Sequence, residues 1–402
     1  MKKHSIIRLA VILTLVAAAA IWFISSATSA GGFLNKGGET AFVTTGVTVD
    51  FDPDSGEAVY TPGSDGFYFA TKDGARFITA ADKQLMTEPY TMQNPVLFGA
   101  GDVMGVVEAS GYDAYIYNTE GLMYAKHYEN PIVNFSVTEQ GYSCVVTKNG
   151  DDYESFVYNH GGAAIGHQED TERIILSTAI SNDGRIWAVS YLDISGAEYN
   201  SYITFGYLKK SEAQGYSDGI YGTLRGENGE LNNQYFSMIR FMNGNNLIVV
   251  SDKAVFCVDA ASPAQAKWIM PLDNELDQAA FYEGYAAFAL GRARQGVPVE
   301  PAGRVILLNM NGERIFERDM GDRVTSLHIG GPGLIVGQDL SFTALGYKNQ
   351  VLWEYNAPFD TRDIQFLDSA ERTVIRTGTD VSIMKLTKIK EPEAAENNQG
   401  DE

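Results

Sequence analysis

The sequence has few cysteines, few histidines and few basic residues for its length. Its 402 residues include 2 cysteines, 5 histidines and 30 lysines and arginines, against 51 aspartates and glutamates. The formal net charge of −21 is spread along the chain, and an acidic surface repels the phosphate backbone of a nucleic acid. We therefore expect no nucleic-acid partner.

Long hydrophobic runs are also absent, with one exception near the N-terminus. Residues 9–24 carry no charge and follow several basic residues. The span of residues 6–24 is long enough for a helix to cross ~30 Å of hydrocarbon, and the basic residues before it place the N-terminus in the cytoplasm. We therefore expect residues 1–30 to form a retained signal anchor at the cell membrane, with Trp22 at an interface and the rest of the chain extracytoplasmic. Cleavage near Ala30, followed by secretion, is the alternative.

One pattern recurs along the rest of the chain. It consists of an apolar strand, a tight polar turn and a second strand with an aromatic residue near its start. The clearest copies are residues 114–124, 305–316 and 342–353, and looser copies lie at residues 76–87, 156–165 and 255–268. Such repetition is typical of one supersecondary unit that cannot bury its own faces and is stacked against its neighbours. The 41 glycines, 22 tyrosines and 20 phenylalanines suit many short strands joined by tight turns.

The repeats divide residues 41–387 into four-stranded units. The third strand of a unit can be placed eight times, at residues 76–80, 113–118, 155–159, 201–208, 254–259, 304–309, 341–347 and 380–386. The units average roughly 43 residues, which is within the range of four-stranded propeller blades. We predict an all-β fold, an eight-bladed β-propeller, with seven blades as the alternative if a weak strand has been over-read. Residues 31–40 are predicted to be a linker, and residues 388–402 a disordered acidic tail.

The last unit lacks an outer strand of its own. Residues 363–367, 372–376 and 380–386 supply three strands, and no apolar strand follows before the tail. Residues 41–51 form a spare strand at the other end of the chain. Pairing the two ends in one blade leaves the ring without an exposed edge. We therefore predict that residues 41–50 pair with residues 380–386.

The repeat resembles that of quinoprotein-like (PQQ-repeat-like) eight-bladed propellers. The resemblance lies in a strand, an Asx-x-x-Gly turn and a following Leu-Trp or Met-Tyr, and the N-terminal anchor resembles uncharacterised membrane-tethered propeller proteins of Gram-positive bacteria. It implies an architecture only, because such propellers range from dehydrogenases to assembly scaffolds. The enzymes hold their quinone with an adjacent cysteine pair and a stacking tryptophan. This chain has no adjacent cysteines, and Trp268 and Trp353 fall in predicted outer strands, so we expect no cofactor.

The two cysteines, Cys144 and Cys257, lie in apolar strands of different repeats. An even number of cysteines in an exported chain is compatible with a disulfide, but two Cα atoms more than ~7 Å apart cannot be bridged. We expect two buried free thiols.

Three short motifs resemble known sites but lack the required context. Residues 215–219 match G-x-S-x-G without a helix after them, so we interpret them as a flexible turn. Residues 50–56 begin like a calcium loop, but the glycine and the final glutamate are out of place, which favours a Pro-Asp-Ser-Gly turn and no metal. Residues 181–187 resemble a turn between inner strands in which an aspartate caps by local hydrogen bonds.

The remaining candidates are loops that enter one face of the predicted ring. In a propeller, the loops between blades and those between second and third strands share a face, which here receives residues 192–200, 226–233 and 291–303. The candidate partner-binding residues are Arg292, Arg294, Glu300, Asn228 and Glu230. Two arginines in one loop of an acidic protein suit an acidic partner. A solvated loop without a ligand is the alternative.

We therefore predict a non-catalytic, membrane-tethered, extracytoplasmic propeller that binds a protein, a peptide or a cell-envelope polymer. The alternative is a hydrolase or lyase acting on an extracellular polymer, with acids from the inner strands meeting at the axis. The predicted inner strands at residues 96–98, 174–180 and 236–241 are mostly apolar or hydroxylic, which favours binding. A third interpretation is a sensor or assembly component whose short cytoplasmic end contacts an intracellular partner.

Overall fold

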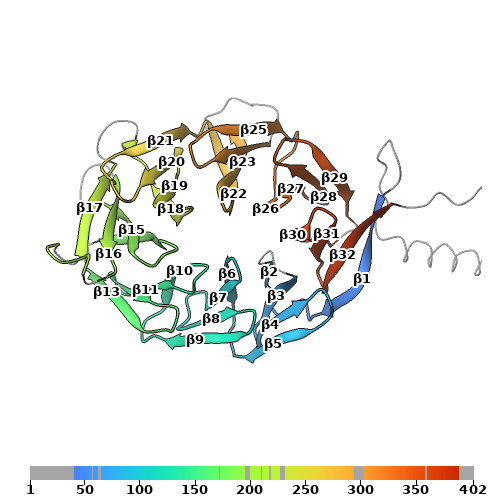
Figure 1. Cartoon of the computed structure of the whole chain (residues 1–402), viewed down its shortest axis with the longest axis horizontal. Helices are drawn as coiled ribbons and strands as arrows, with labels where there is room; N and C mark the ends of the chain where they lie inside the picture. The colour runs from blue at the N-terminus through green and yellow to red at the C-terminus, as the bar shows by residue number, and fades with distance from the viewer. Residues whose placement is uncertain are drawn as a thin grey trace, which may run out of the picture.

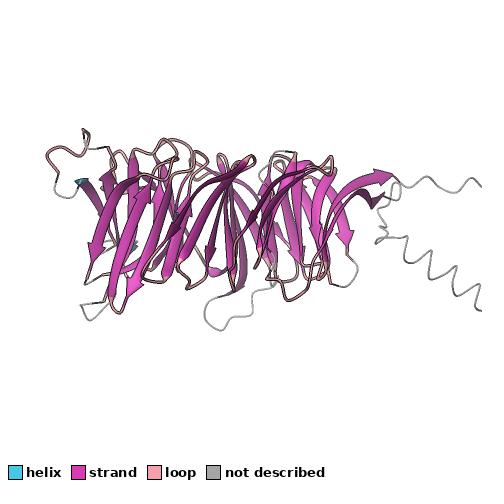
Figure 2. Ribbon diagram, turned by 90° about the horizontal axis from the view of Figure 1, so that it is seen from below, coloured by secondary structure: helices cyan, strands magenta, loops and turns pink. Residues whose placement is uncertain are grey.

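The fold is a ring of antiparallel sheets. The computed structural model describes residues 40–388, apart from residues 57, 62–64, 172, 195–199, 210, 217–218, 227–230, 294–302 and 358–359. Within these residues, strands β1 to β32 form eight four-stranded sheets. Figure 1 shows the sheets arranged as blades around a central opening, and Figure 2 shows the ring edge-on as a flat disc. The predicted eight-bladed β-propeller is confirmed.

Each blade has four strands, numbered outward from the axis. The inner strands are β2 (Ala58–Tyr60), β6 (Pro95–Ala100), β10 (Ile132–Val137), β14 (Ile174–Ile180), β18 (Phe236–Phe241), β22 (Asn274–Tyr282), β26 (Ser326–Gly330) and β30 (Asp363–Ser369). The second strands are β3 (Gly66–Thr71), β7 (Val103–Glu108), β11 (Ser143–Asn149), β15 (Ile186–Asp193), β19 (Asn246–Ser251), β23 (Tyr285–Ala293), β27 (Gly333–Gln338) and β31 (Arg372–Arg376).

The outer half of each blade is the hairpin that carries the sequence repeat. The third strands are β4 (Gly74–Thr79), β8 (Asp113–Asn118), β12 (Asp152–Tyr158), β16 (Asn200–Tyr207), β20 (Ala254–Asp259), β24 (Arg304–Asn309), β28 (Ser341–Gly346) and β32 (Asp380–Lys388). The outer strands are β5 (Gln84–Pro89), β9 (Gly121–His127), β13 (Ala164–Asp170), β17 (Ile220–Arg225), β21 (Ala266–Pro271), β25 (Arg314–Asp319), β29 (Val351–Asn356) and β1 (Thr40–Asp50). We number the blades 1 to 8 from β2–β5 to the blade of β30, β31, β32 and β1. All eight predicted third strands are confirmed.

Blade 8 joins the two ends of the described chain. Strand β1 pairs antiparallel with β32, from Thr40 opposite Lys388 to Asp50 opposite Asp380. A β-bulge interrupts the register between Thr44 and Thr48. The predicted closure is therefore confirmed. Because β1 covers the outer edge of β32, that edge has a hydrogen-bonded partner strand.

The aromatic residue of the repeat ties three of the outer strands, β9, β21 and β29, to the next blade. The indole nitrogen of Trp268 in β21 donates a hydrogen bond to the carbonyl of Met310, and that of Trp353 in β29 donates to the carbonyl of Ala370. The hydroxyl of Tyr124 in β9 likewise donates to the carbonyl of Gly141. Each side chain thus buries an apolar ring between two blades while its polar end is hydrogen-bonded.

The polar turn of the repeat is closed by its Asx side chain. The Asn118 Oδ1 atom accepts hydrogen bonds of 3.0 Å from the backbone N–H groups of Glu120 and Gly121. Asn309 does the same for Asn311 and Glu313, and Gly312 in that turn has a φ of 79°, which a glycine adopts without strain. These local bonds explain why the motif is visible in the sequence.

Both cysteines are buried and free, as predicted. Cys144 lies on β11 of blade 3 and Cys257 on β20 of blade 5. Burial raises the pKa of the Cys144 thiol to about 12 and that of Cys257 to about 11. Both side chains therefore stay protonated at neutral pH and act as apolar packing groups.

The membrane prediction concerns the N-terminal residues. Among the residues that the structure describes, no helix has the length and hydropathy needed to span a membrane. The predicted transmembrane segment at residues 6–24 lies outside the described residues, as do residues 31–39 of the predicted linker and 389–402 of the predicted tail. The two remaining residues, Thr40 and Lys388, belong to β1 and β32. The assignment of residues 6–24, 31–39 and 389–402 stays a prediction.

Candidate functional site

The loop residues predicted from the sequence fall almost entirely outside the described residues. Arg294, Glu300, Asn228 and Glu230 are not described, and Arg292 is described only in its backbone, as part of β23. Their loops join β23 to β24 and β17 to β18. The assignment of these residues to partner binding stays a prediction.

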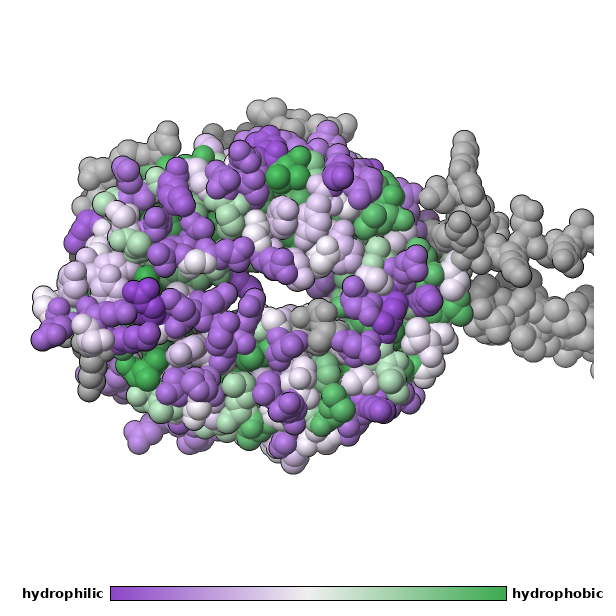
Figure 3. Space-filling model, in the orientation of Figure 1, coloured by the Kyte–Doolittle hydropathy of each residue, from purple (hydrophilic) through white to green (hydrophobic). Residues whose placement is uncertain are grey.

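The described part of the molecule has a different candidate site, at the axis of the ring. Two adjoining cavities of about 430 Å³ and about 730 Å³ lie between the inner strands. We call them the first and the second cavity. They share lining residues that include Glu139, Arg240, Phe281 and Glu283. Figure 3 shows an elongated opening at the centre of the ring, with mostly hydrophilic residues around it.

The cavities reach the face opposite to the predicted loops. Glu139 and Glu283, in the first cavity, and Asp102, in the second, belong to turns between inner and second strands. In an antiparallel blade these turns lie at the other end from the loops between second and third strands. These turns and the strand ends that the Arg292 loop joins, the last residues of β23 and the first of β24, therefore belong to opposite faces of the disc.

β-bulges in three consecutive inner strands shape the first cavity. The register shifts between Ile132 and Asn134 in β10, between Ile175 and Ser177 in β14, and in β18 at Ser237. A bulge inserts one extra residue, which changes the direction of the side chains around it. Met238, just after the β18 bulge, lines the cavity with 40% of its surface exposed.

Neighbouring inner strands are joined by side-chain hydrogen bonds at these bulges. The Asn134 amide nitrogen donates to the carbonyl of Leu176, an unpaired residue of the β14 bulge, at 3.3 Å. The backbone N–H of Ile239 in β18 donates to the Ser177 hydroxyl at 3.2 Å. The carbonyl that the β14 bulge leaves unpaired is thus satisfied by the neighbouring blade, and these bonds join the inner strands of blades 3, 4 and 5.

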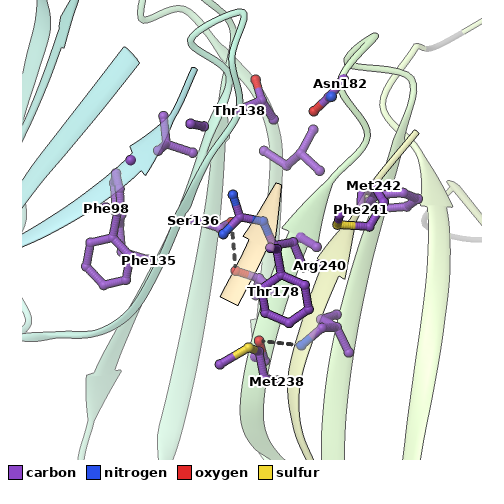
Figure 4. A pocket seen from close by; sticks show the side chains of 18 of the residues that line it. Phe98, Phe135, Ser136, Thr138, Thr178, Asn182, Met238, Arg240, Phe241 and Met242 are labelled. Atoms are coloured by element: carbon purple, nitrogen blue, oxygen red, sulfur yellow. Dashed lines mark hydrogen bonds between the residues drawn. The ribbon is translucent and has the colours of Figure 1, made fainter. Parts of the chain in front are cut away.

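Arg240 is the cation of the axial site. Its side chain extends from β18 into the first cavity (Figure 4), and its Cζ atom lies 5.6 Å from the ring centroid of Phe281 in β22. Among the described residues it has no ion pair or hydrogen bond. Water reaches the side chain, but protein surrounds it, and this desolvation lowers the Arg240 pKa, opposed by Tyr60 and Glu139. A guanidinium remains charged despite such a shift.

A hydroxyl network lies beside Arg240 in the same cavity. The Thr178 hydroxyl donates to the Asn134 Oδ1 atom at 3.1 Å, and the Ser136 and Thr178 hydroxyls are 3.3 Å apart. Apolar side chains complete the wall. They are Leu97, Phe98, Val137, Met238 and Phe281. The first cavity therefore offers one positive charge, the carboxylates of Glu139 and Glu283, several hydroxyls and an apolar surface.

The second cavity contains a histidine held neutral by its surroundings. His328 lies in β26, and burial lowers its pKa to about 4, against an opposing effect from Asp363. Beside it, Gln365 in β30 accepts hydrogen bonds from the Thr61 N–H and hydroxyl and donates to Asp363 at 2.7 Å. These bonds join blade 8 to the first residues of blade 1.

Two of the three short motifs are turns, as interpreted from the sequence. Asp183 accepts from the backbone N–H of Arg185 at 3.1 Å and from the Ser181 hydroxyl at 2.7 Å, between β14 and β15. Asp52 accepts from the N–H of Asp54 at 2.9 Å before Gly56. In the third, residues 217–218 lie outside the described residues. Among the described residues, no group of histidine, cysteine and acidic side chains could hold a metal ion.

These features define an eight-bladed β-propeller with a polar axial cavity. The chain belongs to the family described as "Family of unknown function (DUF5711)", whose sequence model matches residues 42–386. No curated protein matches the chain.

Solved structures with the same fold include proteins of several kinds. BamB from Moraxella catarrhalis is 14% identical, with a TM-score of 0.50 over 86% of this chain and 100% of its own. The C-terminal WD40 domain of Sif2 is 12% identical, with a TM-score of 0.57 over 86% and 98%. Sqt1 of Chaetomium thermophilum, bound to the N-terminus of a ribosomal protein, is 10% identical, with a TM-score of 0.53 over 85% and 98%. At these identities the likeness shows the fold alone.

Proposed function

We propose that this protein is a non-catalytic propeller that binds a protein, a peptide or a cell-envelope polymer outside the cytoplasmic membrane. The observation that carries the proposal is the axial cavity, where Arg240 stands without an ion-pair partner among the described residues, next to hydroxyl and apolar groups. Concave sites with a few convergent polar groups are where ligands usually bind. Sqt1, which shares the fold, is bound to a polypeptide terminus in its solved structure.

The tether is a part of the same proposal. Residues 6–24 would anchor the ring to the membrane, as in the tethered propellers of Gram-positive bacteria that the sequence resembles. We expect the mature protein to stay in the membrane fraction and to retain residues 9–24. If the protein is found in the culture medium with Gly31 as its mature N-terminus, the proposed anchor is wrong. That result would not test the proposed binding function.

The function is tested by crosslinking in intact cells. A photo-crosslinking amino acid at Asn243, which lines the first cavity, is compared with one at Leu85 on the outer strand β5. We expect a discrete adduct from Asn243, identified by mass spectrometry after purification from membranes. The proposal would be contradicted if neither position gave a specific adduct and a chemical crosslinking pull-down also recovered no partner.

A hydrolase or lyase remains the second candidate because carboxylates line the second cavity. Asp102, Glu139, Glu283 and Asp368 are all among its lining residues. This candidate predicts that purified protein releases fragments from cell-envelope polysaccharide, and that Glu139→Gln and Glu283→Gln variants lose the activity. The binding proposal predicts no fragment release by the parent protein.

A further inference from the structure

We infer that Arg240 anchors a carboxylate-binding site in the first cavity, and that the ligand carries a single carboxylate next to an apolar group. The inference deepens the proposed function and rests on it, because it names the chemical group that the axial cavity recognises. Two sources supply this chemistry, namely a small monocarboxylic acid and the C-terminal end of a peptide.

The first step is the position of Arg240. Arg240 has no ion pair or hydrogen bond with a described residue, and its side chain is exposed to water within the cavity, so a ligand can reach it. The Phe281 ring supports the guanidinium at 5.6 Å, but a cation–π contact uses the face of the group and leaves its N–H donors free. Those donors match the two oxygens of a carboxylate.

The second step is the polar wall beside the arginine. Because the Thr178 hydroxyl donates to Asn134, the Ser136 hydroxyl is left to donate to Thr178 across 3.3 Å. That distance is long for a bond between hydroxyls, so Ser136 loses little when it turns toward another acceptor. A carboxylate oxygen in the cavity would provide that acceptor.

The third step concerns the rest of the ligand. Met238 and Phe281 line the cavity with Leu97 and Phe98, and a methionine adapts to ligands of different shape. The volume of about 430 Å³ suits a small ligand or the last residues of a peptide. An apolar group next to the carboxylate would contact these side chains.

The fourth step limits the charge of the ligand. Glu139 and Glu283 line the same cavity as Arg240. A second negative charge would meet their carboxylates, and like charges at close range repel. The site therefore favours a monocarboxylate over a dicarboxylate or a polyanion.

The test measures binding to the full-length chain in lipid nanodiscs by isothermal titration calorimetry. One pair of probes is N-acetyl-Gly-Leu-Leu with a free carboxylate and the same peptide as its C-terminal amide; the other pair is hexanoate and hexanamide. We expect at least one acid to bind about tenfold or more tightly than its amide, as the loss of a charge-assisted contact requires. Preference for the peptide acid alone identifies a peptide end, whereas equal preference in both pairs identifies a small acid. If neither acid binds more tightly than its amide, the inference is wrong.

Variants assign the effect to the arginine. Arg240→Met should abolish the preference for acid over amide, and Arg240→Lys should weaken it several-fold, because a lysine cannot bind a carboxylate bidentately. Arg76→Met, an exposed position on β4, is the matched control and should behave like the parent. A well-folded Arg240→Met or Arg240→Lys protein with the parent's full preference would overturn the inference. If partner adducts still form at Asn243 in such a protein, the proposed function stands while the carboxylate site is wrong.

Discussion

The ring of Phe42 lies edge-on against the indole of Trp353, with the two ring centroids 5.1 Å apart. Phe42 belongs to β1, the first described strand, and Trp353 to β29, the outer strand of blade 7. Phe42 also meets Tyr355 edge-on at 5.1 Å and is 1% exposed. Strand β1 thus completes blade 8 and also fills the core between blades 7 and 8.

Truncating this ring should destabilise the whole propeller. Phe42→Ala removes a buried aromatic side chain, a change that typically costs about 3–5 kcal/mol. Val43→Ala, at the next position, is a matched control because Val43 is 47% exposed, and it should change stability by less than ~0.5 kcal/mol. Urea unfolding followed by fluorescence measures both. Equal stability of the two variants would mean that β1 does not hold the ring closed.

The stability of the protein should fall in acid partly through His328. Its pKa is about 4 in the folded protein against an ordinary value of 6.5, so the unfolded chain binds a proton at a higher pH than the folded protein does. The contribution is fully present above pH 6.5 and is lost as the pH falls toward 4, for about 3 kcal/mol in total. His328→Gln should therefore show a shallower loss of stability between these pH values. His160→Gln, at an exposed position, should keep the slope of the parent. A parent and a His328→Gln variant with the same slope would show that His328 is not responsible.

The two thiols should be inert in the folded protein. Cys144 is 1% exposed and Cys257 is 0% exposed, and burial keeps both thiols protonated. A thiol-specific chromogenic reagent should modify neither of the 2 cysteines in native protein and both after denaturation. Ser262→Cys, at an exposed turn position, is the positive control and should react at once. Rapid modification of a native cysteine in the parent would contradict the packing described for it.

The loop of residues 291–303 gives a separate prediction on the other face of the disc. If Arg292 and Arg294 hold an acidic partner, changing both to Ala should weaken partner capture, most clearly at low salt. The sequence predicts a solvated loop here, and changes at exposed positions usually shift stability by less than ~0.5 kcal/mol, so melting temperatures should stay the same. A double variant of exposed residues Arg76 and Lys267 to Ala loses the same net charge and serves as the control. If the loop variant captures the partner as well as the parent does, the loop does not take part in binding.

The sequence was sufficient for the architecture because the repeat is local. Asn118 and Asn309 close their turns with hydrogen bonds to residues two to four positions away. A short stretch of sequence therefore determines each turn. The closure was predictable because one unit lacked an outer strand and residues 41–51 were unassigned. Each of these inferences needs only patterns along the chain.

The axial site could not be predicted in the same way. The bulges in β10, β14 and β18 depend on hydrogen bonds between blades, such as that from Ile239 to Ser177, and these join residues far apart in sequence. Arg240 did leave a signal, because a single charge within an inner strand that is otherwise apolar or hydroxylic marks a side chain that is not packed in the core. The sequence interpretation treated residues 236–241 as mostly apolar or hydroxylic and looked for cations in the loops instead.

The closure has a mechanical consequence. Thr40 and Lys388 face each other at one end of the β1–β32 pair, so the two ends of the described chain lie side by side. A force that separates these ends acts on one pair of residues at a time, beginning with Thr40 and Lys388, rather than on the whole strand at once. Force applied between the two ends should therefore detach β1 first, at low load, and expose the core around Phe42 while the sheets of blades 1 to 7 remain paired.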